Sequence, residues 1–219
     1  MTSLERIIED CEKARLRVSP HHIVKLVAVS KNVDSEAVES LYQQGQRAFG
    51  ENRVQDLNSK SLSLHDLPLE WHFIGRLQTN KINHLLDLNP FLIHSIDSFE
   101  TAWAIQQRAS VKNLTVNALM QINAAQELSK AGVEPQKALE TYAKIVELCP
   151  SLNLKGVMSI GAHSDEENLI TKSFVETRKI FDELHSYQPT ICSMGMSGDF
   201  VRAIECGSTM VRIGSALFV

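Results

Sequence analysis

The stretch Lys25-Leu-Val-Ala-Val-Ser-Lys31 decides the fold, because it is a short apolar run that ends abruptly on a lysine. Residues 26–29 are too few for a helix and rich in valine, and Asn32, which favours turns, follows soon after. The pattern predicts a buried strand that stops at Lys31. An amine at the rim of an apolar core loses hydration, which favours the neutral nucleophile that Schiff-base chemistry requires. A solvated lysine that only caps a strand is the alternative.

Composition places the chain among ordinary globular proteins. It has 219 residues, 43% hydrophobic and 22% charged, which is long enough to bury a sizeable core. The net charge of -4 and the lack of a basic run argue against nucleic acid as a partner. No apolar run approaches the length of a membrane span and no signal peptide is apparent, so we expect a cytoplasmic protein that does not bind membranes. The four cysteines lack Cys-x-x-Cys spacing, so we expect reduced thiols.

Strand and helix patterns alternate along the whole chain. A helix over residues 3–17, opened by a capping box at Thr2–Glu5, precedes the first strand. Further boxes are predicted at Asp97–Glu100 and Ser164–Glu167. The predicted strands cover residues 26–29, 47–49, 70–75, 91–96, 115–122, 154–160, 190–194 and 209–218. Eight strands alternating with helices favour a closed (β/α)8 TIM-type barrel with an extra N-terminal helix over an open doubly wound sheet. No linker divides the chain, so residues 1–219 are expected to form a single domain.

The predicted strands end in polar residues, and barrel enzymes place their chemistry at those ends. After the seventh strand, Ser197 and Gly198 open a short helix whose free N–H groups suit an anion. Near the end of the eighth, Gly214 and Ser215 can approach a ligand closely. Together with the strand-one lysine, these loops fit pyridoxal 5′-phosphate (PLP), although a plain turn is the alternative for Ser197-Gly198. The polar strand ends are Lys31, Asn52, Gln78-Thr79-Asn80, His94, Asn123, Ser159, Ser197 and Ser215.

Five separated motifs resemble those of the pyridoxal phosphate homeostasis protein family. They are Val27-Ala-Val-Ser-Lys31, Phe49-Gly-Glu-Asn52, Trp71-His-Phe-Ile-Gly75 with Leu77-Gln-Thr-Asn-Lys81, Ser193-Met-Gly-Met-Ser197, and Gly207-Ser-Thr-Met-Val-Arg-Ile-Gly214. The resemblance implies the N-terminal barrel of alanine racemase without its second, β-rich domain. It also implies that PLP is held as an internal aldimine.

The resemblance assigns roles to seven residues. Lys31 would be the Schiff-base lysine, and Arg212 would face the pyridine nitrogen. The phosphate would be held by Ser197, Gly214 and Ser215, and the ring would be lined by Asn52 and Met158. Ala124 and Ala125 depart from the family pattern, because polar residues are expected in that loop.

Arg212 predicts weak catalysis. It shares one strand face with Met210 and Gly214 and should therefore point at the site. An arginine only donates hydrogen bonds, so beside the pyridine nitrogen it would weaken the ring as an electron sink. No tyrosine lies at a predicted strand end to supply a second acid–base group. A structural ion pair inside the barrel is the alternative for Arg212.

We therefore expect a PLP-binding protein that acts in intracellular vitamin B6 and amino-acid homeostasis, with no catalytic residues and little or no catalysis. The expected partners are PLP and possible client PLP-dependent apoenzymes, and we expect a monomer. The histidines lack metal-ligand spacing, so no metal site is predicted. Two alternatives remain: a PLP-dependent amino-acid racemase or lyase that uses the same aldimine, and a barrel that binds another phosphorylated metabolite.

Overall fold

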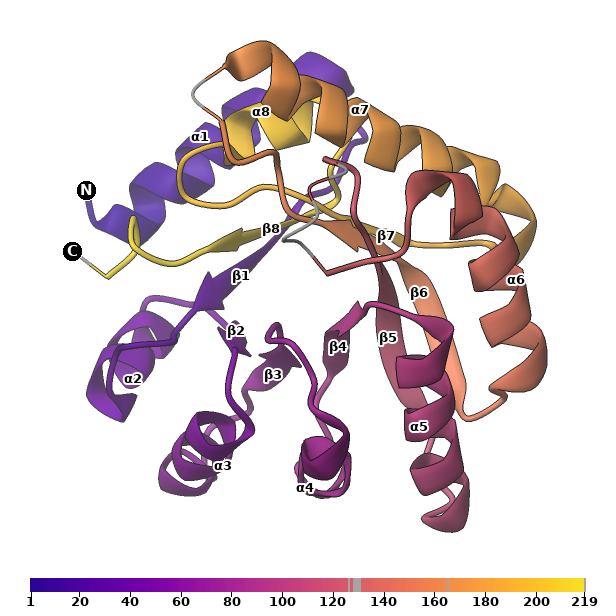
Figure 1. Ribbon diagram of the computed structural model, residues 1–219. Coiled ribbons are helices and arrows are strands. Elements are labelled where there is room, and N and C mark those ends of the chain that lie inside the picture. The colour runs from indigo at the N-terminus through magenta and orange to yellow at the C-terminus, as the bar shows by residue number, and fades with distance from the viewer. Residues whose placement is uncertain (126, 128–130, 165, 219) are drawn as a thin grey trace.

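The computed structural model describes residues 1–125, 127, 131–164 and 166–218. Within them, parallel strands form a closed barrel in the order β1 to β8, and β8 pairs back onto β1 (Figure 1). This architecture confirms the predicted TIM-type barrel. The strands are β1 (Lys25–Val29), β2 (Ala48–Glu51), β3 (Glu70–Phe73), β4 (Leu92–Ile96), β5 (Val116–Ile122), β6 (Leu152–Ser159), β7 (Ile191–Ser193) and β8 (Met210–Ile213).

Helices follow the strands and surround the barrel (Figure 1). The extra N-terminal helix is confirmed, since α1 precedes β1 and packs against α8. The α-helices are α1 (Ser3–Val18), α2 (Ser35–Gln43), α3 (Val54–Ser63), α4 (Ile82–Asp87), α5 (Phe99–Val111), α6 (Ala138–Leu148), α7 (Glu167–Glu183) and α8 (Phe200–Glu205). Short 3-10 turns are η1 (Thr79–Lys81), η2 (Pro135–Lys137) and η3 (His185–Tyr187).

The helix caps confirm one prediction and correct two. The box at Thr2–Glu5 is present, with each side chain accepting from the other residue's backbone N–H. The boxes predicted at Asp97–Glu100 and Ser164–Glu167 are wrong. In α5 the cap is Ser98, whose Oγ accepts from the N–H of Thr101 at 3.1 Å. Asp97 and Ser98 are adjacent, and both residue types are good N-caps, so the sequence pattern alone did not show which of them caps the helix. The side chain of Glu166, at the start of α7, makes no cap hydrogen bond.

The inside of the barrel is filled by a small apolar cluster, distinct from the larger clusters between strands and helices. Its buried members are Val27, Ala48, Leu92, Leu119, Met158 and Met210. Because side chains alternate along a strand, residues two positions beyond an inward residue also point inward. This places the side chains at the carboxyl ends of β6 and β8 over the barrel mouth.

His94 corrects a third prediction, because it lies in the middle of β4 rather than at its end. Its side chain is fully buried, and its Nε2 lies 2.9 Å from Nδ1 of His72 on β3. Burial holds the pKa of His94 well below its usual value, and it also lowers the pKa of His72. The two imidazoles therefore form a neutral pair inside the barrel.

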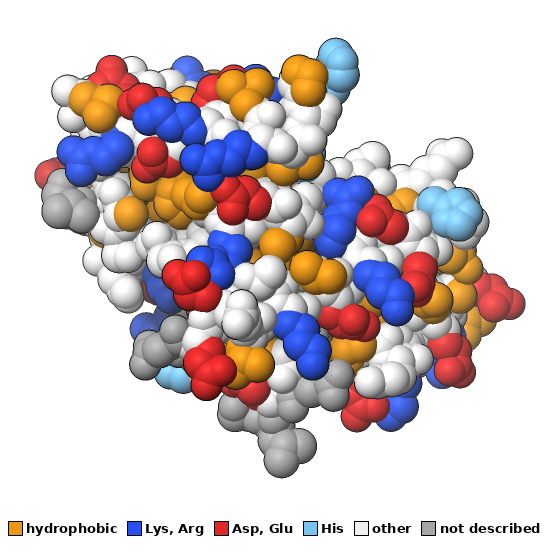
Figure 2. Space-filling view, turned by 90° about the horizontal axis from the view of Figure 1, so that it is seen from above, with side chains coloured by type: hydrophobic (Ala, Val, Ile, Leu, Met, Phe, Trp, Pro, Cys, Tyr) orange, Lys and Arg blue, Asp and Glu red, His pale blue; other side chains and the backbone are white. Residues whose placement is uncertain are grey.

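The face over α1, α7 and α8 carries charges of both signs, interspersed with apolar side chains (Figure 2). Ion pairs join these helices, with Arg17 contacting Glu205 and Arg202 contacting Glu167. Such exposed pairs contribute little stability, so apolar packing of Leu4 and the rest of α1 holds the helix in place. No helix in the described part of the chain has the length and apolar character needed to cross a membrane.

Candidate functional site

The first strand delivers Lys31 to the barrel mouth. The N–H of Ser30 donates to the carbonyl of Gly50 at 3.0 Å, so pairing with β2 continues one residue beyond β1. The chain then turns through Asn32, which has a left-handed φ of 72°. Lys31 itself is solvent-exposed, so the loss of hydration predicted for it is wrong. Ser30, the last residue that pairs with β2, is buried in the core, whereas the next residue, Lys31, lies in an open cavity.

That cavity, of about 790 Å³, lies at the carboxyl ends of the strands. It gathers side chains from residue 31 to residue 215, with apolar walls from Val29, Ile74 and Ile160. Neither Ala124 nor Ala125 is among the described residues that line it. All seven residues assigned a role by the motifs line this one cavity: Lys31, Asn52, Met158, Ser197, Arg212, Gly214 and Ser215.

Arg212 enters the cavity from the inside of the barrel and is only 5% exposed. One guanidinium nitrogen donates to the carbonyl of Ser193 at 3.0 Å and to its hydroxyl at 2.6 Å, and the other donates to the carbonyl of Ser159 at 2.9 Å. Burial lowers the pKa of Arg212 to about 10, an effect that Asp199 opposes, so the group is cationic at neutral pH. Its hydrogen bonds go to carbonyl and hydroxyl oxygens, and it forms no ion pair within the described residues.

The loops after β7 and β8 meet beside the end of β1. The N–H of Gly214 donates to Oγ of Ser197 at 3.2 Å, which ties the two loops together. A Cβ at Gly214 would lie 3.3 Å from the carbonyl oxygen of Val29, so the glycine permits close packing of β8 on β1. Helix α8 begins only at Phe200, so Ser197 lies in the turn before the helix and not in its first turn. Ser215 is exposed to the cavity.

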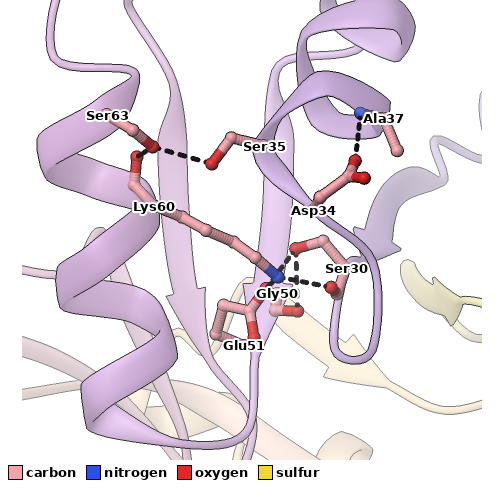
Figure 3. A network of polar contacts seen from close by, with 8 residues as sticks. All are labelled: Ser30, Asp34, Ser35, Ala37, Gly50, Glu51, Lys60 and Ser63. Carbon is pink, nitrogen blue, oxygen red and sulfur yellow. Dashed lines mark hydrogen bonds and ion pairs between the residues drawn. The ribbon is translucent and has the colours of Figure 1, made fainter.

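Sequence reasoning missed a buried polar cluster next to this cavity. The second strand was predicted to stop at Phe49, but β2 continues through Glu51, which is fully buried. Its partner is Lys60 of α3, with Nζ 2.6 Å from the carboxylate (Figure 3). A signal was present, since Lys60 follows Val54 and Leu57 at helical spacing and therefore falls on the buried face of α3.

A closed parallel barrel with a lysine after β1 and a buried arginine on β8 defines a protein of the alanine racemase barrel class. The family model "Alanine racemase, N-terminal domain" matches residues 2–219. The alanine racemase of Clostridium difficile shares the fold with a TM-score of 0.77 at 14% identity, covering 95% of this chain and 58% of that chain.

Closer relatives specify the family. The chain is 54% identical over 215 residues to the pyridoxal phosphate homeostasis protein of Helicobacter pylori, covering 98% of this chain and 96% of that protein. The solved structure of PipY from Synechococcus elongatus, with PLP bound, has a TM-score of 0.81 at 32% identity and covers 96% of this chain and 100% of that chain. The chain belongs to the pyridoxal phosphate homeostasis protein family.

Proposed function

We propose that this protein binds PLP, holds it as an internal aldimine on Lys31, and acts in intracellular vitamin B6 and amino-acid homeostasis with little or no catalysis. The observation that carries the proposal is the convergence of all seven motif residues on one cavity. The family supports it, because PipY, at 32% identity, has PLP bound in its solved structure.

The side chains of the cavity fit PLP. The cofactor supplies an aldehyde, and an exposed amine at Lys31 is free to condense with it, forming a C=N bond and releasing one water. In the neighbouring loops after β7 and β8, the hydroxyls of Ser197 and Ser215 and the backbone of Gly214 suit a phosphate. Asn52 and Met158 line the same cavity and are proposed to flank the ring.

Arg212 is proposed to face the pyridine nitrogen. Its contacts with Ser193 and Ser159 fix the guanidinium, and a pKa of about 10 keeps it charged and donating at neutral pH. A donor at that nitrogen leaves it unprotonated, and the ring then withdraws electrons weakly. A ring that withdraws electrons weakly stabilises a substrate carbanion poorly, so removal of a proton from the substrate is disfavoured.

The tyrosines support the same conclusion. All three lie in helical segments, with Tyr42 in α2, Tyr142 in α6 and Tyr187 in η3. The hydroxyl of Tyr142 donates to the carbonyl of Leu154 at 3.1 Å, outside the barrel mouth. None of them is among the described residues lining the cavity, so none is placed to act as a second acid–base group. This arrangement favours a cofactor carrier over an amino-acid racemase.

Several expectations stay predictions: a single domain over residues 1–219, a monomer, a cytoplasmic location and client PLP-dependent apoenzymes.

Borohydride reduction of the PLP-loaded protein, followed by peptide mapping, tests the proposal. We expect a visible absorbance band before reduction and a pyridoxyl group on Lys31 afterwards. Label found mainly on Lys81, or on Lys130, which lies outside the described residues, would reject the assignment. PLP that binds without any visible band would favour a non-covalent phosphate-binding barrel.

A further inference from the structure

Ser30, Glu51 and Lys60 form a buried cluster of polar contacts (Figure 3). Nζ of Lys60 lies 2.6 Å from Oε1 of Glu51 and donates to the carbonyl of Ser30 at 2.7 Å. The hydroxyl of Ser30 donates to the same Oε1 at 2.6 Å. Glu51 and Ser30 are 0% exposed and Lys60 is 9% exposed. Three residues, one just after β1, one in β2 and one in α3, therefore close a small ring of hydrogen bonds.

The position of the ring in the chain connects it to the cofactor site. Ser30 immediately precedes Lys31, and Glu51 immediately precedes Asn52. Lys31 and Asn52 line the cavity, whereas none of the three ring residues is among the described residues that do so. The ring is joined to these two site residues through the backbone, so we expect it to act on the site through the placement of Lys31 and Asn52.

Helix α3 holds the turn that carries Lys31 at both of its ends. At the start, Lys60 binds the Ser30 carbonyl, which also accepts from the N–H of Val33 at 3.2 Å. At the end of the turn, the hydroxyls of Ser35 and Ser63 lie 2.7 Å apart (Figure 3). The turn between these two ties is short and contains a left-handed Asn32. A short turn fixed at both ends leaves the Lys31 backbone little freedom.

Stability alone does not explain this ring. A buried ion pair is worth little compared with apolar residues of the same size, because both charges lose hydration. The second carboxylate oxygen of Glu51 is buried and has no hydrogen-bond partner in the described part of the chain, which adds to that cost. The hydrogen bond to the Ser30 carbonyl is directional. Unlike apolar packing, it can therefore fix the position of the neighbouring Lys31.

We propose that the Glu51–Lys60 pair is a positioning unit that holds the Ser30 carbonyl and thereby aims the amine of Lys31 at the PLP aldehyde. This inference rests on the proposed function. The pair takes no part in the condensation, in which the Lys31 nitrogen bonds to the aldehyde carbon and one water leaves. Since a misplacement of about 1 Å can cost on the order of 100-fold in rate, loss of the pair should slow aldimine formation by about 10- to 100-fold.

The test compares two ligands of one cavity. Pyridoxine 5′-phosphate carries the ring and phosphate but no aldehyde, so it reports binding without the condensation. The variant Glu51→Gln/Lys60→Met removes both charges at nearly constant volume and leaves no unpaired ion. We expect it to melt as a folded protein and to bind pyridoxine 5′-phosphate within about twofold of the wild type, whereas the visible band should form about 10- to 100-fold more slowly with PLP.

The matched control is Lys25→Met/Glu70→Gln, which removes a Lys–Glu pair between β1 and β3 at the opposite end of the barrel. This control variant should bind pyridoxine 5′-phosphate with the affinity of the wild type and should form the visible band with PLP at the wild-type rate. An unchanged rate of band formation in the Glu51/Lys60 variant would overturn the proposal, and so would equal losses for the two ligands, which indicate a purely structural role. If that variant does not fold, Lys60→Arg, which keeps the charge but displaces the donor from Ser30, decides by the same comparison. Failure of the wild type to form the band would instead reject the proposed function.

Discussion

Ser215→Ala should separate recognition of the phosphate from recognition of the ring. Ser215 is exposed to the cavity, and its hydroxyl makes no hydrogen bond to any other described side chain or backbone group. Its removal should therefore change the free energy of unfolding by no more than about 0.5 kcal/mol. A hydroxyl that donates to a charged phosphate contributes about 1.5 to 3 kcal/mol, so Kd for PLP should rise about 10- to 140-fold.

Ser197→Ala is expected to weaken PLP binding less than Ser215→Ala. Oγ of Ser197 accepts the N–H of Gly214 at 3.2 Å, and loss of the hydroxyl frees that N–H to donate to the phosphate in its place. Unphosphorylated pyridoxal should bind both variants as it binds the wild type.

Absorbance titration of each variant with PLP and with pyridoxal measures both effects. Ser164→Ala, in the loop after β6 and outside the cavity of Lys31, is the matched control and should change neither Kd. Equal losses for the two ligands would mean that the phosphate lies elsewhere, and the reasoning about these loops would be refuted.

Three further predictions follow from the same geometry. Lys31→Ala should keep the melting temperature of the wild type, because an exposed side chain is removed, but should lose the visible band in an absorbance scan. Deuterium exchange at the α-carbon of L-alanine and formation of D-alanine should be far below enzymatic turnover of about 1 to 1000 per second, and turnover in that range would sink the assigned role of Arg212. His72 and the Lys25 ammonium lower the pKa of Glu70 to about 2, from 4.5. The stability that they confer is present above pH 4.5 and is lost as pH falls towards 2, so acid melts of Glu70→Gln should lack this component.

Most of the site residues were accessible from sequence because they lie at or near the ends of recognisable strands. Lys31 and Asn52 come after apolar runs, Ser197 follows the seventh predicted strand, and Ser215 lies near the end of the eighth. Parallel strands that close into a barrel bring all their carboxyl ends to one mouth, so a list of strand ends is also a list of neighbours. His94 was the exception, because a polar residue in mid-strand reads as a terminus unless its buried partner is known.

The lengths of the strands were harder to predict from sequence, because the length of each strand depends on the strand that pairs with it. The last strand was predicted to reach residue 218, but β8 ends at Ile213, which pairs with Ala28 near the end of β1. Conversely, β2 was predicted to end at Phe49 yet continues to Glu51, because β3 offers Phe73 as its partner. A ladder continues only while both strands supply hydrogen bonds, and one strand's own sequence does not contain that information.

The sequence by itself determined the alternation of strands and helices, the closed barrel and the residues at its mouth, because these depend on local periodicity and on repeated strand ends. Only the tertiary structure decided which polar groups are buried and with what. Glu51 meets Lys60 across a strand and a helix, and His72 meets His94 across two strands. A buried charge or imidazole is tolerated only where a partner arrives from another segment, and folding alone brings the two together.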